Sequence, residues 1–97
     1  MSLRKSGLQR EVLALYRRAL RVASKKPAIS QDKFRTFFRY NFHVNAQSIS
    51  PRNINAIEHL LRKGRRQLEQ LEDPAVTDCW VGNEMKEWEV QHPGRRR

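Results

Sequence analysis

The sequence predicts an all-α protein, a three-helix antiparallel bundle followed by an irregular or short-helical C-terminal tail. Apolar residues recur every three or four positions in three separate segments, which is the period of one face of a helix. Proline residues fall between these segments, where helices stop or start. A chain of 97 residues is long enough for one small domain. We expect the bundle over residues 1–74 and the tail over residues 75–97.

The first helix is predicted over residues 6–24. Ser6 and Gln9 have the spacing of a capping box, in which both side chains satisfy backbone N–H groups at a helix start. Two lysines and a proline at residues 25–27 end the helix, because lysine suits the negative end of the helix dipole and proline forces the preceding residue into extended geometry. The apolar stripe of this helix consists of Leu8, Val12, Leu15, Tyr16, Ala19, Leu20 and Ala23.

The second helix is predicted over residues 30–42, with Ser30 as its N-cap. It holds all four phenylalanines of the chain at helical spacing, and we expect most of them in the core because aromatic side chains bury large areas. Residues 44–49 read as a loop. The phenylalanines are Phe34, Phe37, Phe38 and Phe42.

The third helix is predicted over residues 51–72, with Ser50 as its N-cap and Pro51 at its first position. Gly64 interrupts its apolar seam, although glycine within a helix costs about 1 kcal/mol relative to alanine. Close approach of another backbone or side chain is the expected compensation. The seam consists of Ile54, Ile57, Leu61, Gly64, Leu68 and Leu71.

The tail retains enough apolar surface for a short docked segment. Trp80 and Trp88 either fold back on the three helices or become ordered only on a partner, and the sequence favours neither. Cys79 is expected to be a small, partly buried apolar residue. Residues 94–97 read as a solvated end.

The net charge of +10 is unevenly distributed, since the first 26 residues hold eight lysines or arginines against the single acid Glu11. Such asymmetry indicates an acidic partner, an organelle import signal, or both. An amphipathic, arginine-rich start that is nearly free of acids is typical of mitochondrial targeting segments. Because this segment overlaps the first helix, we expect import without cleavage.

Several function classes find no support in the sequence. A single cysteine excludes an internal disulfide, and its spacing to the three histidines fits no common metal site. No apolar run approaches the roughly 20 residues that cross a bilayer, so no membrane span is predicted. There is no glycine-rich phosphate loop and no nucleophile with a recognisable base, which favours a binding protein over an enzyme.

Four sequence features in a fixed order make the chain resemble the LYR-motif proteins of mitochondria. The resemblance covers residues 6–74, and it is closest to the members that assist assembly of succinate dehydrogenase, respiratory complex II. It implies a chaperone or adaptor of the mitochondrial matrix. The four features are Leu8-Gln9 with Val12-Leu13 leading into Leu15-Tyr16-Arg17, Arg35 with Phe38-Arg39, Ile57-Glu58, and residues 61–68.

The resemblance assigns one binding site to Leu15, Tyr16, Arg17 and Phe38. In the family this motif recruits the J-type co-chaperone that delivers iron-sulfur clusters from the scaffold protein. In many relatives it meets acyl carrier protein instead, with an acyl-phosphopantetheine chain between the helices. No cofactor of the chain's own is implied. From the residues alone, Leu15 and Tyr16 would be core and Arg17 a solvated arginine.

A second site is implied at Arg62, Lys63, Gly64, Arg65 and Arg66. In the related assembly factors the matching stretch binds the iron-sulfur subunit of succinate dehydrogenase. Like charges this close are unfavourable unless something acidic meets them, and a solvated face is the alternative.

Two other functions stay open at this stage. The chain could be a LYR accessory or assembly protein of another respiratory complex that acts with acyl carrier protein, since the helices are shared across the family. A basic three-helix domain also suits a nucleic-acid-binding module. Against nucleic acid, three acids are mixed among the cations of the third helix, so we expect no such partner.

Overall fold

The computed structural model describes residues 7–93 and forms an all-helical bundle with a short C-terminal helix, which confirms the predicted fold class. Ser6, the proposed first residue of the capping box, and the predicted solvated end at 94–97 lie outside the described residues. None of the described helices is long and apolar enough to cross a membrane. The helices are α1 (Gly7–Ser24), α2 (Ala28–Ser48), α3 (Ile54–Glu72) and α4 (Asn83–Gln91).

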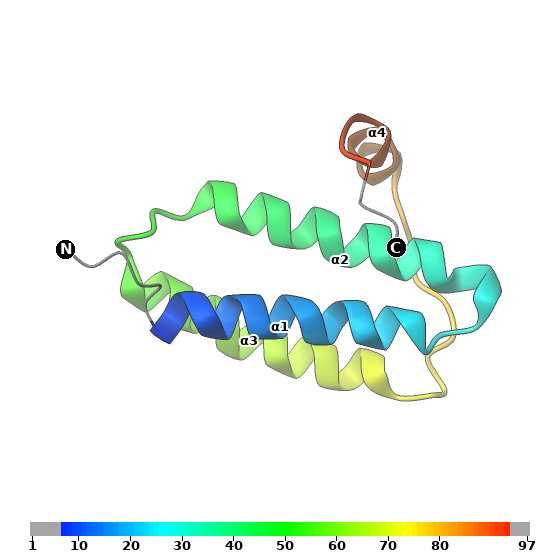
Figure 1. The fold of residues 1–97 in the computed structure, drawn as a ribbon, viewed down its shortest axis with the longest axis horizontal. Coiled ribbons are helices and arrows are strands. Elements are labelled where there is room, and N and C mark those ends of the chain that lie inside the picture. The colour runs from blue at the N-terminus through cyan, green and yellow to red at the C-terminus, as the bar shows by residue number, and fades with distance from the viewer. Residues whose placement is uncertain (1–6, 94–97) are drawn as a thin grey trace.

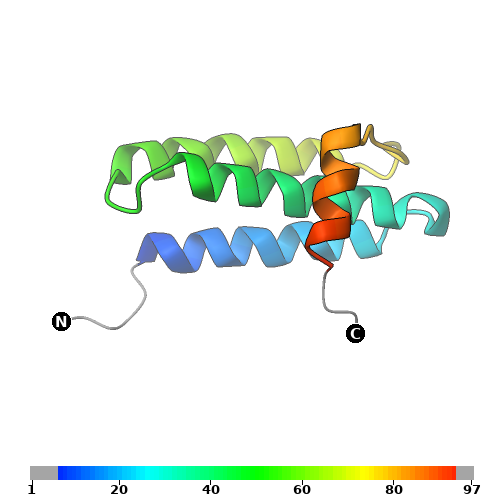
Figure 2. The same ribbon diagram turned by 90° about the horizontal axis from the view of Figure 1, so that it is seen from above.

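Consecutive helices of the bundle run in opposite directions, so α1 and α3 are parallel and α2 is antiparallel to both (Figure 1). Helix α1 packs against α2 and against α3, whereas α4 packs on α2 alone. Seen from above, α4 lies across α2 at a steep angle (Figure 2). The bundle is therefore organised around α1.

The core lies where the apolar stripes of the three long helices meet. Phe34 is fully buried and Phe38 is 5% exposed, while Phe37 and Phe42 pack against the core from its edge, as the phenylalanine spacing predicted. Small side chains on α1 let the neighbouring helices approach closely, since Ala19 and Ala23 are buried. From the predicted seam of α3, only Leu61 and Leu68 are buried, at 4% and 3% exposure.

Helix α2 differs from the predicted span at both ends. It begins at Ala28, directly after Pro27, so Ser30 lies inside the first turn rather than at the cap. The Ser30 hydroxyl donates to the carbonyl of Thr77 at 2.7 Å, with the carbonyl of Pro27 also near at 3.2 Å. It continues to Ser48, so the segment predicted as a loop over 44–49 is mostly helical. No glycine or proline falls between residues 42 and 51 to stop the helix earlier.

Helix α3 begins at Ile54 rather than at residue 51. The Oδ1 atom of Asn53 accepts a hydrogen bond from the backbone N of Ala56 at 3.1 Å, so Asn53 is the N-cap. The predicted cap Ser50 instead accepts from the backbone N of Arg52 at 3.2 Å, within the turn that precedes the helix. Two capping residues stand close together here, and the second one starts the helix.

The tail folds back on the bundle, which decides between the two alternatives that the sequence left open. Lys26 is 6% exposed, and its Nζ atom donates to the carbonyls of Asp73 at 3.2 Å and Val76 at 2.6 Å. Trp88 packs on α2, whereas Trp80 remains 77% exposed. The α1–α2 corner therefore holds the chain that leads into α4.

Candidate functional site

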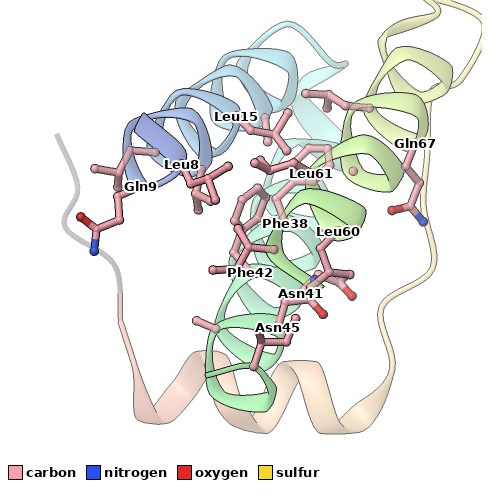
Figure 3. A pocket seen from close by; sticks show the side chains of 18 of the residues that line it. Leu8, Gln9, Leu15, Phe38, Asn41, Phe42, Asn45, Leu60, Leu61 and Gln67 are labelled. Atoms are coloured by element: carbon pink, nitrogen blue, oxygen red, sulfur yellow. The ribbon is translucent and has the colours of Figure 1, made fainter. Parts of the chain in front are cut away.

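An apolar groove is bounded by α1, α2 and α3 (Figure 3). No Cα atom of α2 comes within 8 Å of one in α3, so the two helices leave a space that α1 alone cannot fill. Its volume of about 750 Å³ falls within the range of small-molecule sites. Its walls include Leu8, Leu15, Phe38, Phe42, Leu60 and Leu61.

The three side chains of the tripeptide Leu15-Tyr16-Arg17, predicted as part of the first site, differ in burial. Leu15 is 8% exposed and lines the groove. Tyr16 is half-buried between α1 and α2, where its ring meets Phe42 edge-on with the ring centroids 5.0 Å apart. Arg17 is exposed to solvent. Leucine and tyrosine therefore fix the position of α1, and the arginine is available to a partner.

Phe38, the fourth residue predicted for this site, lies on α2 and lines the same groove as Leu15. Its ring packs edge-on against Phe37 at a centroid distance of 5.8 Å. Because the groove has Phe38 and Phe42 on its wall while Phe34 is fully buried, the phenylalanines of α2 both line the cavity and fill the core beside it.

Gly64 brings the two predicted sites into contact. A Cβ atom built on Gly64 would lie 3.0 Å from Cδ2 of Leu15, which is closer than ordinary van der Waals contact. The glycine thus permits the close approach of α1 to α3, as its position in the apolar seam predicted. It belongs to the groove wall rather than to the charged surface of α3.

The cations of the predicted second site do not act as one group. Arg62, Lys63 and Arg66 are exposed. Arg65 instead donates from Nη2 to Oε1 of Glu11 at 2.6 Å and joins α3 to α1. The side chain of Arg65 is still 44% exposed, so all four cations reach solvent, and within the described residues only Arg65 among them forms an ion pair.

A second ion pair, Arg18 with Glu72, also joins α1 to α3. The Nε and Nη2 atoms of Arg18 donate to the two carboxylate oxygens at 2.8 and 2.9 Å. These hydrogen bonds raise the pKa of Arg18 and lower the pKa of Glu72, because each partner favours the charged form of the other. Sequence reasoning missed both pairs, since nothing local indicates which residues of separate helices will meet.

Helix α1 also carries exposed arginines, which add to the exposed cations of α3. Arg10, Arg17 and Arg21 are spaced by seven and four residues and so lie on one face of the helix. Helix α1 packs against α3 and two ion pairs join the two helices, so this face and the exposed cations of α3 belong to the same bundle. We call these exposed cations of α1 and α3 the basic surface; they are Arg10, Arg17, Arg21, Arg62, Lys63 and Arg66.

Within residues 7–93, no group of three or more histidine, cysteine or acidic side chains is placed to hold a metal ion. Cys79 is partly buried against the core, as predicted, and this burial raises the pKa of its thiol. The arrangement offers contact surfaces for partners: an apolar groove and a basic surface.

Comparison with known proteins identifies related sequences. A protein named succinate dehydrogenase assembly factor 1A, mitochondrial, from Dictyostelium discoideum is 47% identical over 73 residues, which are 74% of this chain and 80% of the relative. Succinate dehydrogenase assembly factor 1, mitochondrial, from Schizosaccharomyces pombe is 44% identical over 75% of this chain and 91% of its own. The protein of that name from Saccharomyces cerevisiae is 36% identical over 80% and 98%.

No solved structure is significantly similar to the chain. The sequence profile described as complex 1 protein of the LYR family matches residues 10–70, more than half of the chain. This match spans the tripeptide at Leu15, the phenylalanines of α2 and the basic stretch of α3. The chain therefore belongs to the LYR family of complex 1 proteins.

Proposed function

We propose that this protein is a mitochondrial assembly factor for succinate dehydrogenase, and that it acts as a non-catalytic adaptor in the matrix. The observation that carries the proposal is the identity of 47%, over most of both chains, with a relative that bears this function in its name. Relatives from two further organisms are named succinate dehydrogenase assembly factor 1. The exposed cations and the groove supply the surfaces that such an adaptor needs.

The client in this proposal is the iron-sulfur subunit of succinate dehydrogenase. Arg62, Lys63 and Arg66 project from α3 into solvent and meet acidic side chains of the client. An arginine fork binds a carboxylate through two parallel hydrogen bonds, which gives the contact direction as well as charge. Arg65 is paired with Glu11 of α1, and because this pair is exposed, Arg65 can also turn to an acidic side chain of the client.

The partner at the tripeptide is the J-type co-chaperone that brings iron-sulfur clusters from the scaffold protein. Tyr16 is held by Phe42, and this contact fixes the helix from which Arg17 projects. A cluster is cargo in this scheme and passes from the co-chaperone to the client. One small bundle with two contact surfaces thus keeps the immature subunit next to the delivery machinery.

The groove gives this protein a way to bind acyl carrier protein as well. An acyl chain on the phosphopantetheine arm of that protein would lie against the apolar walls that Leu15, Phe38 and Leu61 provide. Burial of each methylene contributes about 0.8 kcal/mol, so a long chain gives substantial affinity. The basic surface beside α1 suits the acidic character of the carrier.

A pull-down of the tagged protein from mitochondria tests the proposal. Three forms are compared with wild type: Tyr16→Ala with Arg17→Ala, Arg62→Ala with Arg66→Ala, and the control Arg52→Ala with Lys86→Ala, which removes two exposed cations elsewhere. We expect the first variant to lose the co-chaperone and the second to lose the iron-sulfur subunit. The control keeps both partners.

Other outcomes point to the remaining functions. Recovery of acyl carrier protein together with subunits of a different respiratory complex would assign the chain to another branch of the LYR family. Recovery of nucleic acid alone, lost at raised salt, would replace the proposal with a nucleic-acid-binding role.

A further inference from the structure

Among the described helices, α4 packs on α2 alone, through side chains of α2 that do not line the groove. No residue of α4 is fully buried. Oε1 of Glu89 accepts a hydrogen bond from Oγ1 of Thr36 at 2.7 Å, and Oε2 lies 3.3 Å from Nη1 of Arg39. One part of the attachment is therefore polar and depends on Glu89.

The second contact is aromatic and centres on Trp88. The guanidinium of Arg39 lies over the indole at 4.9 Å from the ring centroid, and the ring of His43 lies 5.1 Å away. Arg39 also donates from Nη2 to the carbonyl of His92 at 2.6 Å. With its side chain only 16% exposed, Arg39 is enclosed by α4.

This packing leaves one buried polar group unsatisfied. Nε1 of Trp88 is buried and has no hydrogen-bond partner within the described part of the chain. A buried donor without an acceptor destabilises the docked position of α4, because the same N–H group would form a hydrogen bond with water if it were exposed. Nine residues are also too few for a helix to be stable on its own, so α4 depends on this imperfect contact.

Charge distinguishes α4 from the helices of the bundle. Helix α4 carries three acids, Glu84, Glu87 and Glu89, against one cation, Lys86, whereas the three long helices together hold more Lys and Arg than acids. Arg39 lies within the stretch that matches the family profile, and α4 lies outside it. A net-acidic helix outside the profile match therefore contacts an arginine inside it.

We propose that the face of α2 formed by Thr36, Arg39, Tyr40 and His43 is a binding site for an acidic helix of a partner protein, with α4 as its internal occupant. The partner helix supplies a carboxylate to Arg39 and Thr36 and an aromatic ring to the space between Arg39 and His43. This site is separate from the groove and from the basic surface, and it does not rest on the proposed function.

The connection to the bundle makes α4 a strong competitor. Lys26 and Ser30 tether the preceding segment, so α4 stays close to its site at an effective concentration of about millimolar. A partner therefore displaces α4 only when its helix binds tightly or when a second contact, such as one with the basic surface, holds it nearby. The site is closed to helices that lack this second contact.

The test uses the full-length protein and a fluorescent peptide of residues 80–93, with binding followed by anisotropy. Trp88→Ala with Glu89→Gln removes the aromatic contact and the carboxylate charge at Arg39, and it leaves α2 intact. The hydrogen bond from Arg39 to the carbonyl of His92 that remains does not hold a helix of nine residues by itself. We expect this opened variant to bind the peptide at least about tenfold more tightly than wild type, because the internal competitor is gone. Glu87→Gln is the control, since this acid lies exposed on the same helix, and it should behave as wild type.

Two further arms identify the site and the ligand chemistry. Adding Arg39→Ala to the opened variant abolishes peptide binding. A designed acidic helix that shares only the adjacent tryptophan and glutamate with α4 binds the opened variant as well. Hydrogen exchange shows lost protection in α4 of that variant and unchanged protection in the three long helices.

Any of four results overturns the proposal. These are equal peptide binding by wild type and the opened variant, binding that survives Arg39→Ala, failure of the designed helix to bind, and undiminished protection of α4 in the opened variant. The exchange measurement on the long helices separates each of these from a general loss of folding.

Discussion

At the scale of single residues, Leu15 and Gly64 bring the Leu15-Tyr16-Arg17 tripeptide of α1 into contact with the basic stretch of α3. Glycine inside an apolar seam predicted a close approach, because only a compensating contact offsets its low helix propensity. The identity of the approaching residue could not be predicted, since it belongs to another helix. The structure shows that it is Leu15 of the tripeptide.

Replacement of Gly64 by valine tests this contact. The added methyl groups enter the space of Leu15, and overpacking of this kind costs about 1–3 kcal/mol, or roughly 4–8 °C in Tm for each kcal/mol. We expect thermal unfolding to show that decrease. Gly64→Ala should change Tm little, because the end of Leu15 can shift and alanine gains helix propensity. Gly7→Val is the control, as a Cβ there meets nothing within 4 Å. A Gly64→Val protein with wild-type Tm would refute the contact.

The ion pair between Arg18 and Glu72 predicts a pH dependence of stability. The folded state lowers the pKa of Glu72, so folding favours the ionised carboxylate. The stabilisation is therefore complete above the ordinary glutamate pKa of about 4.3 and is lost as the pH falls through the lowered value. Half-exposed pairs of this kind contribute about 0.2–1 kcal/mol.

Tm is measured for wild type and Glu72→Gln at neutral pH and about two units below the ordinary glutamate pKa. Wild type should unfold at the higher temperature at neutral pH, and the difference should vanish in acid. Glu58→Gln removes an exposed acid of the same helix and should show no such change. A difference that persists in acid would mean that the carboxylate charge is not its cause.

At the scale of helices, the periodicity of apolar residues predicted all three long helices. The first residues of α2 and α3 were not predicted, because more than one residue near each start is suited to be the N-cap. Ser30 and Ser50 are good N-caps by residue type, yet Ser30 bonds to Thr77 and Ser50 precedes a turn. Asn53 takes the cap of α3. Tertiary contacts decide such choices, and they are invisible in one local segment of sequence.

Lys26 should control the attachment of the tail. Lys26→Met keeps the length and apolar contacts of the side chain but leaves the carbonyls of Asp73 and Val76 without their donor, at a cost of about 1–3 kcal/mol. We expect hydrogen exchange in residues 76–91 to accelerate while α1 and α3 stay protected. Lys25→Met, at an exposed neighbouring position, is the control. Equal exchange in both variants would show that Lys26 does not hold the tail.

The groove between α2 and α3 should take an acyl chain on acyl carrier protein. Leu60→Arg places a charge on its wall, and we expect the carrier to disappear from the purified protein. His59→Arg adds the same side chain at an exposed position of the same helix and should keep it. Mass spectrometry of the co-purified carrier makes the measurement. Equal recovery with both variants would exclude the groove as the acyl site.

At the scale of the whole molecule, the fold class and the exposed cations could be predicted, and the relations between them could not. The sequence groups Arg65 with the other cations of α3, whereas in the structure Arg65 forms an ion pair with Glu11 of α1. The groove results from the separation of α2 and α3, a property of packing rather than of either helix. The sequence left the position of the tail open because its few apolar residues suit docking and solvent alike.

The most direct test of the central claim is succinate dehydrogenase activity in Saccharomyces cerevisiae cells that lack the related assembly factor and express this chain instead. We predict that wild type restores the activity, that Arg62→Ala with Arg66→Ala restores much less at equal protein level, and that Arg52→Ala with Lys86→Ala restores it fully. The account is contradicted if the protein accumulates in mitochondria and the activity remains absent, or if the basic-stretch variant restores it as well as wild type does.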